Sequence, residues 1–128
     1  MIVGLGIDIA EVPRIRQALE RHGERLLNRL FTPAEIEYCR QYRNPYERFA
    51  ARFAAKEAAM KALGTGWRRG IHWRDIEVCN LPTGKPCLKL TGKALEIFTA
   101  LGGVNTVVSL THTERYALAE VVIEAQHL

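Results

Sequence analysis

Two carboxylates lie in segments that are otherwise apolar. Asp8 is part of the stretch IVGLGIDIAE at residues 2–11, and Glu57 is part of an alanine-rich stretch at residues 46–63. Withdrawing a carboxylate from water costs roughly several kcal/mol unless a cation or hydrogen-bond donors meet it. Carboxylates suit Mg²⁺, which takes one or two of them together with water and phosphate oxygens. If the two segments face each other, Asp8 and Glu57 could hold one cation.

Lys61 follows Glu57 by one helical turn and would point toward the same place. A metal ion with a lysine beside it suits a pyrophosphate, because phosphoryl transfer depends mainly on positioning and charge neutralisation. The same residues have a plainer interpretation. Glu57 and Lys61 could be an exposed helical ion pair worth ~0.3–0.5 kcal/mol, and Asp8 could cap a neighbouring loop. Spacing alone leaves both interpretations open.

The first strand, at residues 2–11, has two unlike faces because side chains alternate along a strand. One face carries Val3, Leu5, Ile7 and Ile9, and the other carries Gly4, Gly6 and Asp8. A strand without side chains lets another chain or a ligand come close. We therefore expect the glycine face to be a place of close approach.

The remaining pattern predicts an α+β fold, with a curved antiparallel sheet packed on a long central helix. Pro13 suits a helix start and Gly23 a helix end, and Thr32 with Glu35 forms a capping box. The alanine-rich helix spans residues 46–63, and strands are expected at 76–79, 88–90, 104–110 and 116–124. The 128 residues contain no linker or repeat, so we expect one domain, 1–128.

Composition indicates a globular protein with a modest basic excess. Eighteen Lys and Arg residues against fourteen Asp and Glu residues give a net charge of +4. This excess is compatible with a nucleic acid, a phosphorylated metabolite or an acidic protein as partner. No apolar stretch is long enough to cross a membrane, and the N-terminus does not resemble a signal peptide. Both features favour the cytoplasm.

The three cysteines form no C-x-x-C pair. Cys79 and Cys87 could face each other across a hairpin, but two reduced thiols are the preferred interpretation for a cytoplasmic chain. The arginines between residues 14 and 29 are either a solvated face or a surface for an acidic protein or a nucleic-acid backbone.

Several motifs together resemble the small bacterial branch of the 4′-phosphopantetheinyl transferase superfamily. They are GLGIDIAEVPRI near the start, RFAAKEAAMKALGTG in the centre, and NLPTGKPCLKL and VSLTHTERYALA toward the end. The resemblance spans essentially the whole chain. It implies transfer of 4′-phosphopantetheine from coenzyme A to a serine of apo acyl carrier protein, with release of adenosine 3′,5′-bisphosphate, in support of fatty acid biosynthesis.

The resemblance also implies roles for individual residues. Asp8 and Glu57 would bind Mg²⁺ at the pyrophosphate of coenzyme A, Lys61 would neutralise phosphate charge, and Glu57 or a metal-bound water would accept the serine proton. The implied coenzyme A contacts are Arg52, Lys56, Lys61, Gly64, Thr65, Gly66, His112 and Thr113, the last two from a neighbouring subunit. Members of this branch are homotrimers, and the glycine face would suit close approach between subunits. Arg14, Arg21 and Arg25 would bind the acidic carrier protein.

Two other functions are compatible with subsets of these residues. A Mg²⁺-dependent nucleotide pyrophosphohydrolase would need the same acids and lysine, with water as nucleophile. A basic nucleic-acid-binding module would use the arginines alone, but the chain lacks a basic motif interleaved with aromatic residues. We therefore expect no nucleic-acid partner and no membrane partner.

Overall fold

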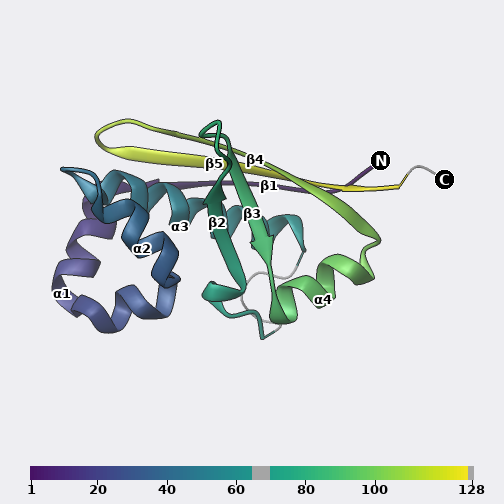
Figure 1. The fold of residues 1–128 in the computed structure, drawn as a ribbon, viewed down its shortest axis with the longest axis horizontal. Helices are drawn as coiled ribbons and strands as arrows, with labels where there is room; N and C mark the ends of the chain where they lie inside the picture. Colours follow the sequence, from purple (N-terminus) through teal and green to yellow (C-terminus); the bar gives the residue numbers. More distant parts are fainter. Residues whose placement is uncertain (65–69, 127–128) are drawn as a thin grey trace.

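The computed structural model describes residues 1–64 and 70–126 (Figure 1). The elements are β1 (Ile2–Glu11), α1 (Val12–Leu30), α2 (Pro33–Arg40), α3 (Pro45–Ala62), the 3₁₀ turn η2 (Trp73–Asp75), β2 (Ile76–Asn80), β3 (Pro86–Leu90), α4 (Gly92–Ala100), β4 (Gly103–His112) and β5 (Tyr116–Ala125). This arrangement confirms the predicted α+β class with antiparallel strands and a long helix.

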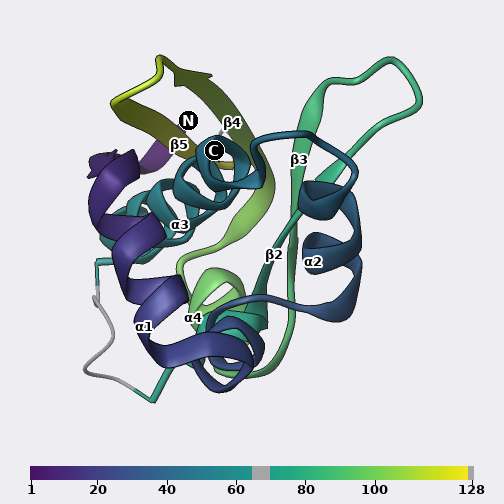
Figure 2. The same cartoon turned by 90° about the vertical axis from the view of Figure 1, so that its left-hand side faces the viewer.

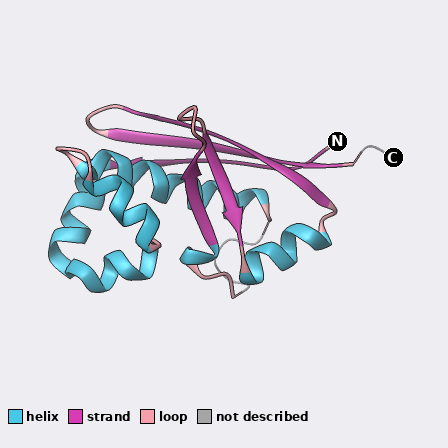
Figure 3. Cartoon of the chain, viewed as in Figure 1, coloured by secondary structure: helices cyan, strands magenta, loops and turns pink. Residues whose placement is uncertain are grey.

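Three strands form one antiparallel sheet in the order β1-β5-β4, and α3 lies along one face of it (Figures 1 and 3). The central strand β5 alternates strictly, with Ala117, Ala119, Val121 and Ile123 fully or almost fully buried on one face. They belong to one apolar cluster with the alanines of α3. Small residues on both elements bring sheet and helix close together.

The glycine face of β1 lies directly on α3. A Cβ added to Gly6 would stand 1.9 Å from the carbonyl oxygen of Ala58, and one added to Gly4 would stand 2.2 Å from that of Ala62. Only glycine allows backbone to approach backbone this closely. The prediction of close approach is confirmed, but the approaching element is a helix of the same chain. The expectation that another subunit meets Gly4 and Gly6 is therefore wrong.

The apolar face of β1 points away from α3. Leu5, Ile7 and Ile9 are 61%, 54% and 58% exposed. Val107 on β4 is exposed as well, and the register aligns Leu5 with Val122 of β5 and Val122 with Val107. The outer face of the sheet, defined by these five residues, is an apolar surface that nothing in the described chain covers.

The helical region before α3 follows the sequence signals closely. Gly23 has non-helical angles, φ 62° and ψ −148°, and divides α1 into two helical segments where a helix end was predicted. The capping box at the start of α2 is present, because the Thr32 hydroxyl accepts from the Glu35 amide and the Glu35 carboxylate accepts from the Thr32 amide. Both predictions are confirmed.

β2 and β3 form a separate two-stranded hairpin that stands apart from the main sheet (Figure 2). Cys79 lies directly opposite Cys87, with 5.0 Å between their Cα atoms, and the two form a disulfide. The register agrees with the sequence analysis, whereas the preference for two reduced thiols is wrong for this structure. Across the ranges 1–64 and 70–126, no helix combines the length and apolarity needed to cross a bilayer.

Candidate active site

Asp8 and Glu57 come together because of the contact between β1 and α3. Asp8 follows Gly4 and Gly6 on the strand face that lies against the helix, next to the turn that carries Glu57. Burial, the charge of Asp8 and a hydrogen bond between the two carboxyl groups together raise the pKa of Glu57 to about 7, with burial the largest cause. A shift with these causes requires the two acids to be neighbours, as the sequence analysis predicted.

Lys61 completes this group. Its ammonium donates to Asp8 Oδ1 at 2.8 Å and to the backbone oxygen of Ile7 at 3.1 Å. The Lys61 side chain is 53% exposed, whereas that of Asp8 is only 14% exposed. The hydrogen bond to Asp8 raises the pKa of Lys61, so the lysine is a cation at neutral pH. The plain i,i+4 pair between Glu57 and Lys61 is therefore not the main contact of this lysine.

The donor set fits a magnesium ion. Two adjacent carboxylates repel each other unless a proton or a cation lies between them, and this repulsion adds to burial in raising the pKa of Glu57. No group of three or more His, Cys, Asp or Glu side chains that could enclose a metal occurs within residues 1–64 and 70–126. Two carboxylates with open positions suit Mg²⁺, which keeps water and substrate phosphate oxygens as its other ligands.

A cavity of about 400 Å³ opens beside Glu57 between β1, α1 and α3. Its lining is largely apolar, with Ile15 and Phe53 among the residues, and Arg14 lies at its wall. Arg21 and Arg25 line a second depression farther along α1. Arg14 and Arg21 therefore lie on the first helical segment of α1, which borders the cavity beside Glu57, and Arg25 lies on the second segment, beyond Gly23.

Lys56 is a structural cation. It is 0% exposed and donates to Glu35 Oε1 at 2.7 Å, to the Trp73 oxygen at 3.1 Å and to the Ile76 oxygen at 2.5 Å. These three acceptors use all of its protons. Burial lowers the pKa of Lys56, and Glu35 opposes that shift. The geometry corrects the sequence-based expectation of a coenzyme A contact, because Lys56 has neither exposed surface nor a free donor.

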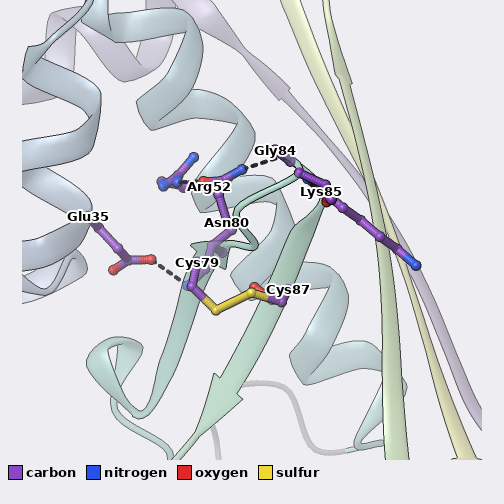
Figure 4. Close-up of a disulfide and its surroundings, with 9 residues drawn as sticks. Glu35, Arg52, Cys79, Asn80, Gly84, Lys85 and Cys87 are labelled. Carbon is purple, nitrogen blue, oxygen red and sulfur yellow. Dashed lines mark hydrogen bonds between the residues drawn. A yellow bond between two sulfur atoms is a disulfide. The ribbon is translucent and has the colours of Figure 1, made fainter.

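Arg52 is buried too, and it lies beside Asn80 of the β2–β3 hairpin (Figure 4). It is 3% exposed, and its Nη2 donates to the neutral side chain of Asn80 at 2.7 Å. Its Nε is buried with no hydrogen-bond partner. Its guanidinium lies 4.0 Å from the centre of the Tyr38 ring. No carboxylate forms an ion pair with Arg52 in the part of the chain that the structure describes.

His112 and Thr113 lie at the turn between β4 and β5. His112 Nδ1 is 3.3 Å from Glu47 Oε2, near the start of α3, and the Thr113 hydroxyl accepts from the Tyr116 amide at 3.1 Å. Gly64 follows α3 with φ 78°, the left-handed conformation that favours glycine. Thr65 and Gly66, two further predicted coenzyme A contacts, lie outside the described residues.

The predicted site residues thus form two groups. Asp8, Glu57 and Lys61 meet between α3 and β1, whereas Arg52 faces the β2–β3 hairpin. Arg52 and Glu57 are five residues apart, which places them ~140° apart around an α-helix. Sequence reasoning missed Asn80, whose neutral side chain gives no local signal, and assigned Glu35 only a capping role.

Comparison with known proteins agrees with this geometry. Residues 4–121 match the family model of the 4′-phosphopantetheinyl transferase superfamily. The chain is 56% identical over 124 residues to holo-(acyl-carrier-protein) synthase of Koribacter versatilis, covering 97% of this chain and 99% of that protein. It is 52% identical to the synthase of Solibacter usitatus, with the same coverage.

Solved structures agree as well. The holo-(acyl-carrier-protein) synthase of Neisseria meningitidis superposes with a TM-score of 0.87 at 36% identity, covering 97% of this chain and 99% of that one. The Helicobacter pylori synthase in complex with coenzyme A superposes with a TM-score of 0.83 at 29% identity, covering 94% and 99%. These comparisons confirm the predicted family and fold.

Proposed function

We infer, because this chain belongs to the 4′-phosphopantetheinyl transferase superfamily, that it transfers 4′-phosphopantetheine from coenzyme A to a serine of an apo acyl carrier protein. The products are the holo carrier protein and adenosine 3′,5′-bisphosphate, and the reaction serves fatty acid biosynthesis. The observation that carries this function onto the present chain is the meeting of Asp8 and Glu57, with Lys61 beside them.

We propose that Asp8 and Glu57 hold Mg²⁺. When bound, the ion would offset the negative charge of the coenzyme A pyrophosphate. The exposed ammonium of Lys61 can turn from Asp8 toward a phosphate oxygen and stabilise the charge that develops as the bond breaks. The Glu57 carboxylate can accept the proton that the attacking serine hydroxyl loses.

The second anchor for coenzyme A is Arg52. Coenzyme A carries a 3′-phosphate besides its pyrophosphate, and a buried guanidinium without a carboxylate partner suits such a group. Arg52 and Glu57 face different sides of α3, so one coenzyme molecule is more readily held by Glu57 of one subunit and Arg52 of the next. His112 and Thr113, at the β4–β5 turn, would join Arg52 in that role.

We also propose a homotrimer, because one face of the sheet would otherwise remain exposed to water. The outer face of the sheet is apolar and uncovered in the single chain, and such surfaces mark interfaces. This surface replaces the glycine face as the proposed place of contact. It lies on the side of β1 opposite to Asp8, so assembly would leave the catalytic acids accessible.

Arg14, Arg21 and Arg25 would bind the carrier protein. All three are exposed on the two segments of α1, and Arg14 borders the cavity beside Glu57. An acidic partner docked along this helix would have its serine near the catalytic acids. We also propose a cytoplasmic location, because coenzyme A and the carrier proteins of fatty acid synthesis are used there.

The test incubates the protein with coenzyme A, Mg²⁺ and an apo carrier protein and determines the mass of the carrier protein. We expect a gain of one phosphopantetheine group, and no gain with Asp8→Asn or Glu57→Gln. Cleavage of coenzyme A without modification of the carrier protein would instead establish a pyrophosphohydrolase. Absence of turnover by the unmodified protein would contradict the proposal altogether.

A further inference from the structure

The interior of the described chain contains one unmatched charge. Its buried charged residues are Glu35, Arg52 and Lys56. Glu35 and Lys56 form an ion pair at 2.7 Å in which both side chains are 0% exposed. Arg52 is left without a carboxylate, although an isolated buried cation costs several kcal/mol, roughly. A buried cation without a carboxylate partner is expected where an anionic ligand binds.

Asn80 is the residue that orients this charge. Its Oδ1 accepts from Arg52 Nη2 at 2.7 Å, the one hydrogen bond of the Arg52 side chain within the described residues. Asn80 itself is fixed, since its Nδ2 donates to the Gly84 oxygen at 3.0 Å across the turn of the hairpin. With the amide nitrogen engaged by Gly84, the amide oxygen is the atom left for Arg52.

The rest of the hairpin makes Asn80 a rigid support (Figure 4). Leu81 donates to Lys85 at 2.8 Å and Gly84 donates to Leu81 at 2.7 Å, which closes the turn. The Cys79–Cys87 disulfide joins the strands one position before Asn80, and the Val78 amide donates to Glu35 at 2.8 Å. The backbone around Asn80 is therefore fixed on both sides, by the disulfide and the Glu35 contact before it and by the closed turn after it.

We propose that Asn80 is a positioning residue that aligns the Arg52 guanidinium for the 3′-phosphate of coenzyme A while leaving the positive charge available. A side-chain amide accepts a hydrogen bond but carries no charge, so it orients a guanidinium without neutralising it. A carboxylate at position 80 would have nearly the same shape and would satisfy the arginine completely. This inference rests on the proposed function, which assigns Arg52 to a phosphate of coenzyme A.

The experiment measures binding of coenzyme A and of 3′-dephospho-coenzyme A by titration calorimetry, with Asn80→Asp and Asn80→Ala compared with the unmodified protein. We expect Asn80→Asp to weaken coenzyme A binding roughly tenfold or more, because the carboxylate neutralises Arg52. Asn80→Ala should weaken it several-fold through lost alignment. Binding of 3′-dephospho-coenzyme A should change by less than twofold in both. A purely structural role would weaken both ligands alike.

Asn28→Asp is the matched control, since it adds the same charge at an exposed position of α1. It should leave both affinities unchanged. If circular dichroism shows that Asn80→Asp does not fold, the test uses Asn80→Ala alone. The measured quantity is then the ratio of its affinities for coenzyme A and 3′-dephospho-coenzyme A. Variants that keep the preference of the unmodified protein for coenzyme A would overturn the inference. An unmodified protein without that preference would instead refute the role of Arg52 in the proposed function.

Discussion

Gly6→Ala should separate the two candidate metal ligands. The new Cβ would stand 1.9 Å from the Ala58 oxygen, and also 2.9 Å from the Ala58 carbonyl carbon and the Ala62 nitrogen. These are backbone atoms in the middle of α3, so no side chain can rotate away. Since Cβ contacts under 3.0 Å are essentially never seen, β1 must move from α3 by roughly 1 Å or more.

The displacement should affect both stability and activity. Overpacking of this kind costs about 3 kcal/mol, at the upper end of the usual range, because the contact is with backbone. Asp8 follows Gly6 by two residues on the same face and would move with it, away from Glu57. Misplacing a reacting group by 1 Å can cost about 10²-fold in rate. We therefore expect Gly6→Ala to lose both stability and metal-dependent turnover.

Urea unfolding followed by circular dichroism measures the free energy, and the carrier-protein mass assay measures turnover. Gly4→Ala, whose Cβ would stand 2.2 Å from the Ala62 oxygen, should show the same effects more weakly. Thr99→Ala on the exposed surface of α4 is the control and should change neither. Gly6→Ala with a free energy of unfolding within about 0.5 kcal/mol of the unmodified protein would show that this contact does not position the acids.

Further predictions concern charge, burial and assembly. In the metal-free protein, the raised pKa of Glu57 contributes to the free energy of unfolding. This contribution is complete below pH 4.5 and is lost as the pH rises through about 7. In urea unfolding with a chelator present, the free energy of unfolding of the unmodified protein should therefore fall from pH 6 to pH 8 relative to that of Glu57→Gln. Parallel pH dependences of the two proteins would contradict this. Lys56→Met leaves Glu35 without its cation and should cost about 3–5 kcal/mol by urea unfolding, and a loss under about 1 kcal/mol would refute the pairing. Ile7→Asp in the apolar outer face should convert the proposed trimer to monomers in light scattering, and an intact trimer would exclude this face. Arg14→Glu with Arg21→Glu should raise the carrier-protein KM roughly tenfold without affecting coenzyme A, and weakened coenzyme A binding would refute the division of surfaces.

The elements and the acidic pair were predictable because their signals are local. Thr32 and Glu35 predict a helix start from four consecutive residues, and Gly23 interrupts α1 where its helical pattern stops. Asp8 and Glu57 attract attention because each is an acid in an apolar setting. Their spacing left their meeting open, and the resemblance to the 4′-phosphopantetheinyl transferase superfamily implied it.

Other features depend on contacts that sequence spacing does not contain. The glycines of β1 announce a close approach, but nothing local tells whether a helix of the same chain or a second subunit approaches. Lys56 falls within an apolar helical stripe, and its explanation is Glu35, 21 residues away along the chain. Asn80 reaches Arg52 over 28 residues. Such pairings appear only once the hairpin is placed beside the helix.

The buried alanines of α3 limit how this enzyme can be altered. Ala58 and Ala62 receive the backbone of β1, while Ala50, Ala54 and Ala55 are completely enclosed. Any larger side chain along this helix would push a neighbouring element outward, and with it Asp8 or the hairpin that holds Arg52. Attempts to broaden the range of carrier proteins should therefore vary the exposed side of α1, where a change of side chain leaves the helix–sheet spacing untouched.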